Sequence, residues 1–384
     1  MRSDHPLQFK KLLAWRSVLP RQTEAWTPIG GDRQSPCRSR NADPLMKNNE
    51  KPKLKDVAEL AGVSIGSASR ALSTPHLVKT ATLEKVVAAV RKLGYVRDGA
   101  ARALASRRTY SIGAIFPTFN NPVFAEAVQA LQQRLNALGY HLIISAHEYD
   151  QERELVNVRN MIERGIEGLL LVGTEHSPAV YDTLDASQCP FILMWSLDGA
   201  HTHHCVGFSN EEGGRMVAKH LLDLGHKDIA MISGVVAYNE RAQYRLKGVT
   251  EALREAGIEL AAHQIIQQPF TLEGGRAGLR MAMELTPQPT AVVCSTDVTC
   301  IGAIAEARLL GLRVPTELSI TGFDDIDFAA VSVPALTTVS VPSTDIGISS
   351  ANNIVAMIEG RPIAKRERVQ IDLIVRQSTA PVKT

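Results

Sequence analysis

One stretch decides the fold of the N-terminal part of the chain: Leu54-Lys-Asp-Val-Ala-Glu-Leu-Ala-Gly-Val-Ser-Ile-Gly-Ser-Ala-Ser-Arg-Ala-Leu72. Its apolar spacing predicts two short helices on either side of a turn. Ala58 is small enough to let the two helices cross closely, and Gly62 suits a turn that needs positive φ. Ser64 can cap the second helix. Together these features predict a helix-turn-helix.

The segment around this motif is strongly basic. Residues 47–108 carry 13 Lys and Arg against 5 Asp and Glu, whereas residues 109–384 carry 21 against 31. Charge alone leaves open a solvated basic surface. A basic helical module on an acidic body is, however, typical of nucleic-acid-binding proteins. An apolar stripe over residues 83–90 predicts a third helix, which Gly94 would end.

Beyond residue 110, short β-branched runs alternate with amphipathic helical windows. The strands expected are residues 111–116, 141–145, 168–172, 191–195, 228–232, 291–294 and 319–323. The helices expected between them include residues 124–138, 152–164, 213–224, 245–256 and 272–284. This alternation predicts an α/β fold with parallel sheets covered by helices. Its length favours two lobes with a ligand cleft between them.

Composition excludes several classes of protein. Of the 384 residues, 45% are hydrophobic, as in ordinary globular chains, and no apolar run is long enough for a membrane-spanning helix. The five cysteines are odd in number and form no C-x-x-C pair, which argues against a disulfide framework or a zinc site. The first 45 residues lack a signal-peptide pattern. We therefore expect a cytoplasmic protein that does not bind membranes.

Several separated motifs resemble the lactose/galactose repressor (LacI/GalR) family of bacterial transcriptional regulators. They are Val57-Ala-Glu-Leu-Ala-Gly-Val-Ser64, Ser69-Arg70, Gly94-Tyr95-Val96, Ala101-Arg-Ala-Leu-Ala105, Gly225-His226, Arg245-Leu-Lys-Gly248, Gly322-Phe-Asp-Asp325 and Pro334-Ala-Leu-Thr-Thr338. The resemblance covers about residues 53–380. Because the motifs keep their order, it is more specific than a shared fold would be.

The leading segment, residues 1–46, is irregular and rich in Arg, Ser, Pro and Gln, so we expect a disordered tail or a natural start at Met46. The resemblance implies three further segments. Residues 47–97 form a three-helix DNA-binding headpiece, and residues 98–109 a hinge helix or linker. The rest, 110–384, is a two-lobed core like that of periplasmic binding proteins, used for ligand binding and dimerisation. The lobes are expected at about 110–208 with 339–372, and at about 209–338.

The second helix of the motif corresponds to the family's recognition helix. The residues that the resemblance places against DNA are Ser64, Ile65, Gly66, Ser67, Ser69 and Arg70. Gly66 has no side chain, and Ile65 can make only apolar contact, for instance with a thymine methyl group. Arg70 is therefore the candidate for a bidentate guanine contact.

The resemblance also places Leu104 at the family's wedge position, where two copies in a dimer enter the minor groove and bend the DNA. The alternative is a buried linker residue, but neighbouring arginines such as Arg102 favour the DNA interpretation. Some positions depart from the family. Lys53 and Lys79 stand where Ser or Thr usually caps a helix, and Arg97-Asp98 replaces the usual Pro-Asn before the hinge.

The family's effector cleft corresponds to Phe124, Trp195, Arg241, Arg245, Phe270, Thr296, Asp297 and Asp324. The resemblance implies that Asp324 accepts hydrogen bonds from ligand hydroxyls and that Arg245 anchors the ligand. Thr296 stands where sugar-binding members often have Asn. Arg241 lies four residues before Arg245, and two guanidinium groups would suit a carboxylate. We therefore expect a sugar or sugar acid, with an Arg241–Glu240 ion pair as the alternative role of Arg241.

The leading hypothesis is a ligand-responsive repressor that binds a pseudo-palindromic DNA operator as a homodimer, since the C-terminus has no leucine-heptad helix for a tetramer. A transporter's solute-binding protein would instead carry a signal peptide and no basic headpiece. An enzyme is disfavoured because the carboxylates near Asp324 have no nucleophile or acid–base partner. No cofactor or metal is expected; the segment His201-x-His203-His204-Cys205 fits no recognised metal-ligand spacing, and its histidines are interpreted as surface residues.

Overall fold

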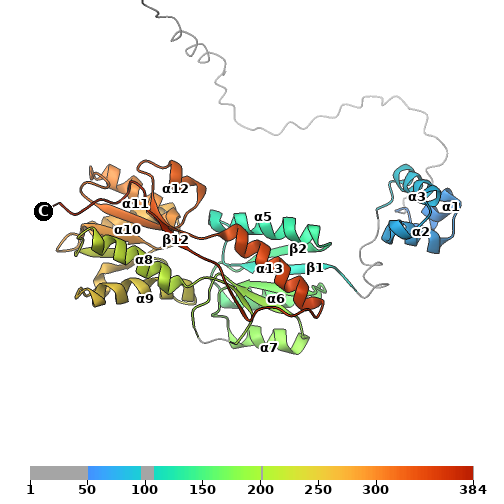
Figure 1. Ribbon diagram of the computed structural model, residues 1–384, viewed down its shortest axis with the longest axis horizontal. Helices are drawn as coiled ribbons and strands as arrows, with labels where there is room; N and C mark the ends of the chain where they lie inside the picture. Colours follow the sequence, from blue (N-terminus) through green and yellow to red (C-terminus); the bar gives the residue numbers. More distant parts are fainter. Residues whose placement is uncertain (1–50, 97–107, 200–201, 384) are drawn as a thin grey trace, which may run out of the picture. The chain divides into compact units, whose positions relative to one another are not determined.

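The computed structural model describes residues 51–96, 108–199 and 202–383 (Figure 1). These residues fall into two compact units, divided between Val96 and Arg97. The expectations for the tail at 1–46, for the hinge, and for Arg102 and Leu104 lie outside the described residues.

The first unit is a three-helix headpiece. Its helices are α1 (Leu54–Ala61), α2 (Ile65–Ser73) and α3 (Thr80–Leu93), with a short 3₁₀ turn, η1, at Pro75–Leu77. Gly62 ends α1 with a φ of 65°, and Gly94 ends α3 with a φ of 61°. Ser64 Oγ accepts a hydrogen bond of 3.1 Å from Ser67 N–H, as expected of an N-cap. The helix-turn-helix prediction is confirmed.

The substitution of lysine at the first cap is compensated locally. The Asp56 carboxylate, in the first turn of α1, accepts a 2.7 Å hydrogen bond from the backbone N–H of Lys53. A carboxylate at that end also interacts favourably with the helix dipole. Lys79, at the start of α3, makes no side-chain capping bond.

The headpiece core is made of small side chains. Its buried apolar residues are Val57, Ala58, Ala61, Ala68, Ala71, Val86 and Ala89, with Val63 and Leu72 among the half-buried residues packed around them. Alanines allow the helices to approach closely, as predicted for Ala58. The same feature limits how much apolar surface the unit buries.

The second unit contains two lobes. The first is a six-stranded parallel sheet in the order β11-β5-β4-β3-β1-β2. Its strands are β1 (Ser111–Phe116), β2 (His141–Ala146), β3 (Gly168–Val172), β4 (Phe191–Met194), β5 (Cys205–Gly207) and β11 (Arg366–Arg368). Its helices are α5 (Pro122–Ala137), α6 (Gln151–Glu163), α7 (Pro178–Ser187) and α13 (Ser343–Ile358), and α13 packs beside α5 (Figure 1).

The second lobe repeats this plan with the strand order β12-β10-β9-β8-β6-β7, in which only β12 is antiparallel. Its strands are β6 (Ile229–Ser233), β7 (Ile265–Gln267), β8 (Ala291–Cys294), β9 (Ser319–Asp324), β10 (Thr337–Ser340) and β12 (Asp372–Ile374). Its helices are α8 (Asn210–Asp223), α9 (Glu240–Glu255), α10 (Leu272–Met283), α11 (Asp297–Leu309) and α12 (Asp327–Val331), with the 3₁₀ turn η2 at Ala262–Gln264. The predicted α/β class is confirmed.

The chain passes between the lobes three times: between β5 and α8, between β10 and α13, and between β11 and β12. The boundary expected near residue 339 falls inside β10, a strand of the second sheet, so the return to the first lobe comes after Ser340. In both sheets the buried parallel strands are nearly continuous apolar runs, as helices on both faces require. Within the described residues, every helix is too short or too polar to cross a bilayer.

Helices α8 and α9 pack with their backbones in contact, and glycines make this possible. A Cβ on Gly248 would lie 1.9 Å from the carbonyl oxygen of Glu211, and one on Gly214 would lie 2.2 Å from that of Arg245. Backbone atoms cannot yield as a flexible side chain can. The two glycines therefore determine how deeply α9, which carries Arg241 and Arg245, sits against the lobe.

We expect Gly248→Ala to destabilise the second unit by about 2 kcal/mol or more, because the added methyl group forces the helices apart. Urea denaturation followed by circular dichroism measures this change. Arg254→Ala, exposed near the end of α9, should stay within about 0.5 kcal/mol of wild type. Equal stability of the two variants would show that α8 and α9 are not held at this distance.

Candidate DNA interface and ligand cleft

Helix α2 has one buried and one exposed face. Ala68 and Ala71 are buried against the headpiece core, whereas Ile65, Gly66 and Arg70 are exposed. Ile65 is 51% exposed, so its side chain is accessible to a partner. Among the residues that the structure describes, no carboxylate pairs with the Arg70 guanidinium. The predicted base-reading residues therefore share one free face.

The serines in and just before α2 make hydrogen bonds to near neighbours in the sequence. Ser64 and Ser67 share a hydrogen bond of 2.9 Å between their hydroxyls, and the Ser69 carbonyl accepts one of 2.7 Å from Ser73 Oγ. Ser64 is exposed, while Ser67 and Ser69 are half-buried. These hydroxyls lie at the border of the free face, where phosphate oxygens would approach.

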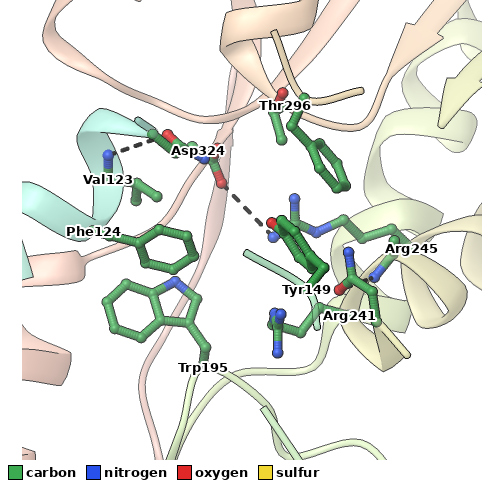
Figure 2. Close-up of a pocket in the computed structure, with 12 residues that line it drawn as sticks. Val123, Phe124, Tyr149, Trp195, Arg241, Arg245, Thr296 and Asp324 are labelled. Carbon is green, nitrogen blue, oxygen red and sulfur yellow. Dashed lines mark hydrogen bonds and ion pairs between the residues drawn. The ribbon is translucent and has the colours of Figure 1, made fainter. Parts of the chain in front are cut away.

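The second unit has a pocket between its lobes, at the carboxyl ends of the parallel strands (Figure 2). This is where α/β sheets usually bind ligands. The lining residues are Asn121, Val123, Phe124, Tyr149, Trp195, Asn239, Arg241, Ala242, Arg245, Phe270, Thr296 and Asp324. Seven of the eight cleft residues expected from the sequence are in this set; Asp297 is the exception.

Arg245 is buried on α9 of the second lobe, where it lines the pocket. Its Nη1 donates to the carbonyl of Ser295 at 2.6 Å, and its Nε donates to Asn210 Oδ1 at 3.0 Å. Its guanidinium carbon lies 3.7 Å from the centroid of the Phe323 ring, a cation–π contact. Burial lowers the pKa of Arg245, while Asp324 opposes that change. The surrounding bonds fix the guanidinium in one orientation.

Asp324 ends β9 and faces Arg245, with 3.7 Å between Oδ1 and the arginine Nη2. Its other oxygen accepts a 3.1 Å hydrogen bond from Asn121 Nδ2 of the first lobe. Its φ of 117° is unusual for a residue with a side chain and turns the carboxylate out of the strand direction. Burial raises the pKa of Asp324 to about 6, although Arg245 and Asn121 oppose the rise. The carboxyl therefore titrates within one unit of neutrality.

Asp297 does not line the pocket. It is fully buried behind Asp324, where Oδ1 accepts from Thr338 Oγ1 at 2.6 Å and Oδ2 accepts from Ile326 N–H at 3.0 Å. Burial, together with Asp324, raises the pKa of Asp297 to about 8. One oxygen thus binds β10 and the other binds the loop after β9. Asp297 supports these segments and does not make the expected contact with the pocket.

Arg241 lines the pocket and also pairs with its neighbour. Its Nη1 lies 3.3 Å from Glu240 Oε1 and donates at 3.1 Å to the carbonyl of Val172. The ion pair that the sequence left as an alternative is therefore present. The guanidinium nevertheless faces the pocket (Figure 2), so the ion pair does not exclude the expected ligand contact.

Aromatic rings form the remaining walls. Phe124 and Trp195 meet edge to face at 5.1 Å on one side of the pocket, and Tyr149 stacks on Phe270 at 5.6 Å (Figure 2). Among the described residues, the buried Trp195 Nε1 has no hydrogen-bond partner. Burial raises the pKa of Tyr149, so its hydroxyl stays protonated. Thr296, the N-cap of α11, completes the lining.

Five lining residues were not expected from the sequence: Asn121, Val123, Tyr149, Asn239 and Ala242. Asn121 and Asn239 cap α5 and α9, whose first turns meet the pocket. An Asn just before a helix that follows a predicted strand is a usable signal for a cleft residue. The predicted helices began at residues 124 and 245, which is two residues after the start of α5 and five after that of α9. Neither asparagine was therefore recognised as a helix cap.

The histidine-rich segment near residue 203 does not line the pocket. The ring of His203 stacks on Tyr181, with centroids 4.7 Å apart, and His204 Nδ1 lies 3.1 Å from the carbonyl of Ala364. His201 is outside the described residues. Over the described part of the chain, no group of three or more His, Cys, Asp and Glu side chains is arranged to hold a metal ion.

Comparisons with known proteins agree with this division into two units. Residues 53–98 match the family described as "Bacterial regulatory proteins, lacI family", and residues 218–379 match "Periplasmic binding protein-like domain". Over 334 residues the chain is 33% identical to the HTH-type transcriptional repressor PurR of Erwinia tasmaniensis, covering 85% of this chain and 96% of that protein. This chain belongs to the lacI family.

Solved structures of similar proteins extend the comparison to the fold. The lac repressor dimer bound to operator and the anti-inducer ONPF has a TM-score of 0.76 and 25% identity, covering 86% of this chain and 100% of that one. The CelR–cellobiose complex has a TM-score of 0.64 and 27% identity, covering 85% and 99%. This lacI-family protein is therefore a ligand-responsive transcriptional regulator with a DNA-binding headpiece and an effector-binding core, as the sequence predicted.

In this lacI-family core, we expect Arg245→Ala to lower the free energy of unfolding by about 3 kcal/mol, because the buried Ser295 carbonyl and Asn210 side chain lose their donor and Asp324 loses its counter-charge. Urea denaturation at pH 7.5 measures the loss. Adding Asp324→Asn should restore part of it, since the unpaired charge is gone. Arg254→Ala, exposed on the same helix, is the control; a loss as large there as at Arg245 would contradict the explanation.

Proposed function

We propose that this regulator is a repressor of genes for carbohydrate uptake or catabolism, controlled by a sugar-like effector in the inter-lobe cleft. The observation that carries this proposal is the composition of the cleft. A buried Arg245–Asp324 pair faces the edge-to-face rings of Phe124 and Trp195. A sugar has both features to match, hydroxyl groups along its edge and an apolar C–H face.

The donors and acceptors of the cleft fit such a ligand. Asp324 accepts from hydroxyls, and Arg245 and the unpartnered Trp195 N–H donate to oxygen. Leaving that N–H buried and unpaired costs free energy that a ligand oxygen would recover. The cavity between the side chains is small, about 30 Å³. We propose that a sugar ring is accommodated by a change in the lobe arrangement.

That change supplies the link to DNA. A ligand that binds one arrangement of the lobes better than another shifts the balance between them, and operator affinity shifts reciprocally. We propose that the free face of α2 reads the operator, with Arg70 contacting guanine and Ile65 contacting a thymine methyl group. Because operator DNA lies in the cytoplasm, the protein acts there. Its role is regulatory and not enzymatic.

We propose further that the operator-binding form is a homodimer. An apolar groove on the second lobe, lined in part by Leu272, Val298, Ile301, Phe328 and Val331, is the surface we assign to the second copy. Phe328 and Val331 are 63% and 73% exposed there. A patch of this kind favours a protein partner. The lac repressor, whose solved form is a dimer, provides the precedent.

We expect Arg70→Ala to weaken operator binding by about 1–3 kcal/mol, which is roughly 5- to 150-fold, while binding to random DNA changes little. Mobility shifts on a duplex selected from random sequences by the wild-type protein measure both affinities. Arg91→Ala removes one exposed charge from α3 and is the matched control. Equal losses for the two variants, on operator and random DNA alike, would reduce Arg70 to a phosphate contact.

We expect effector binding to weaken as the pH falls. With a pKa of about 6, Asp324 is ionised at pH 7.5 and can accept hydroxyl hydrogen bonds, whereas at pH 5 most of it is protonated. Affinity should therefore drop by about tenfold between these pH values. Calorimetry with a sugar selected by thermal-shift screening measures it. Asp324→Asn should bind weakly at both pH values; an unchanged pH dependence in that variant would implicate another group.

A further inference from the structure

Two consecutive residues at the start of α9 reach from the second lobe to the first. Glu240 Oε1 accepts a hydrogen bond of 2.9 Å from the backbone N–H of Thr174, and Arg241 Nη1 donates one of 3.1 Å to the carbonyl of Val172. Their partners lie in and after β3 of the first sheet. A carboxylate and a guanidinium thus hold the same short loop, one through its N–H and the other through its C=O.

Both side chains are almost completely buried, with exposed fractions of 5% for Glu240 and 6% for Arg241. Separated, each charge would lack compensation in a medium of low polarity. They compensate each other at 3.3 and 3.4 Å, and the loop backbone satisfies further hydrogen-bonding positions. Closing the lobes thus exchanges the water contacts of both charges for these fixed hydrogen bonds.

The loop is shaped to fit the pair. Gly173 lies between the two bonded residues and has a φ of 105°, a value that side chains disfavour. A Cβ there would lie 2.1 Å from Arg241 Nη1 and 2.9 Å from Glu240 Oε1. Glycine is thus required both by the backbone conformation and by the approach of the charged groups.

The same loop is fastened to the body of the first lobe. Gly173 N–H donates to the carbonyl of Met194 at 2.9 Å, and its own carbonyl lies 3.2 Å from His176 Nε2. The other ring nitrogen of His176 lies 2.9 Å from the buried carboxylate of Glu154 on α6. Because the loop cannot move alone, pulling on it moves the first sheet.

We propose that Glu240 and Arg241 form a clamp that holds the two lobes closed over the cleft. Every partner in it is a protein atom, so the clamp needs no ligand to form. Arg241 also lines the pocket, and a ligand that engages its guanidinium must change the clamp. In this respect the inference builds on the proposed function: the clamp sets the lobe equilibrium on which the effector acts.

Other contacts also cross the cleft. Tyr149 stacks on Phe270 and Asn121 bonds to Asp324, and these groups directly face the ligand space. On the exposed side of α9, Gln243 Nε2 donates a 3.1 Å hydrogen bond to Glu175 Oε2 of the first lobe. Glu240 is not among the lining residues. It is a positioning residue for Arg241, and its substitution changes lobe closure without removing a group that lines the pocket.

The test measures the distance between the lobes in the full chain. Spin labels on a ketone-bearing amino acid at positions 182 and 254, exposed on α7 and α9, avoid the native cysteines. The labelled protein is mixed with an excess of unlabelled protein, so that a dimer carries labels on only one of its subunits. The measured distance then lies within that subunit. Pulsed electron paramagnetic resonance then gives the distribution of distances between the two labels, with neither ligand nor DNA present.

For the wild-type clamp we expect one narrow distribution, and for Glu240→Gln and Gly173→Ala a shift to longer and broader distances. Glu251→Gln, farther along α9 and outside the clamp, should match wild type. Circular dichroism confirms folding, and if Gly173→Ala fails to fold, Glu240→Gln decides. A folded Glu240→Gln variant with the wild-type distribution would overturn the clamp. That result would leave the operator and effector proposals standing, because the measurement uses neither.

Discussion

The buried guanidinium of Arg245 is the interaction on which the second unit depends. A permanent charge inside a lobe is tolerated only when its hydrogen-bonding groups and its charge are all matched. The matching groups come from different elements: Asn210 from α8, Ser295 from the end of β8, and Asp324 from β9. Burying one side chain thus draws the carboxyl ends of the strands together. Arg245 and Asp324 also line the cleft, on the side of the second lobe that faces the first.

Much of the fold follows from the sequence, and the rest has identifiable physical reasons. The buried strands β1 and β3 are largely apolar runs, which carry their own signal. The strands not predicted are only three or four residues long, namely β5, β7, β10, β11 and β12. So few residues show little period, and their pairing is decided by the neighbouring strand. Helix α11, like α7 and α13, was not among the helices named from the sequence; its apolar and polar residues are spread around it, so no stripe marks it.

The candidate site was predictable through the family motifs to a similar degree. Asp297 shows the limit: it follows Thr296, but the turn of α11 points its carboxylate back toward Thr338. Sequence position does not report side-chain direction. Tyr149 follows β2 and has a φ of 62°, a conformation that is uncommon for a residue with a side chain. No residue pattern in the sequence predicted this turn toward the pocket. The Arg241–Glu240 pair was considered from the sequence, but its grip on the loop at Gly173 depends on a tertiary contact.

The alanine-rich core of the headpiece has a thermodynamic consequence. Five of its seven buried apolar residues are alanines, so the unit gains little from burial while it loses the conformational entropy of its three helices. Its stability is therefore expected to be lower than that of a unit of the same length with larger buried side chains. Operator DNA, which binds the folded form alone, adds its binding free energy by mass action. Bound DNA thus contributes stabilisation that the small core does not supply.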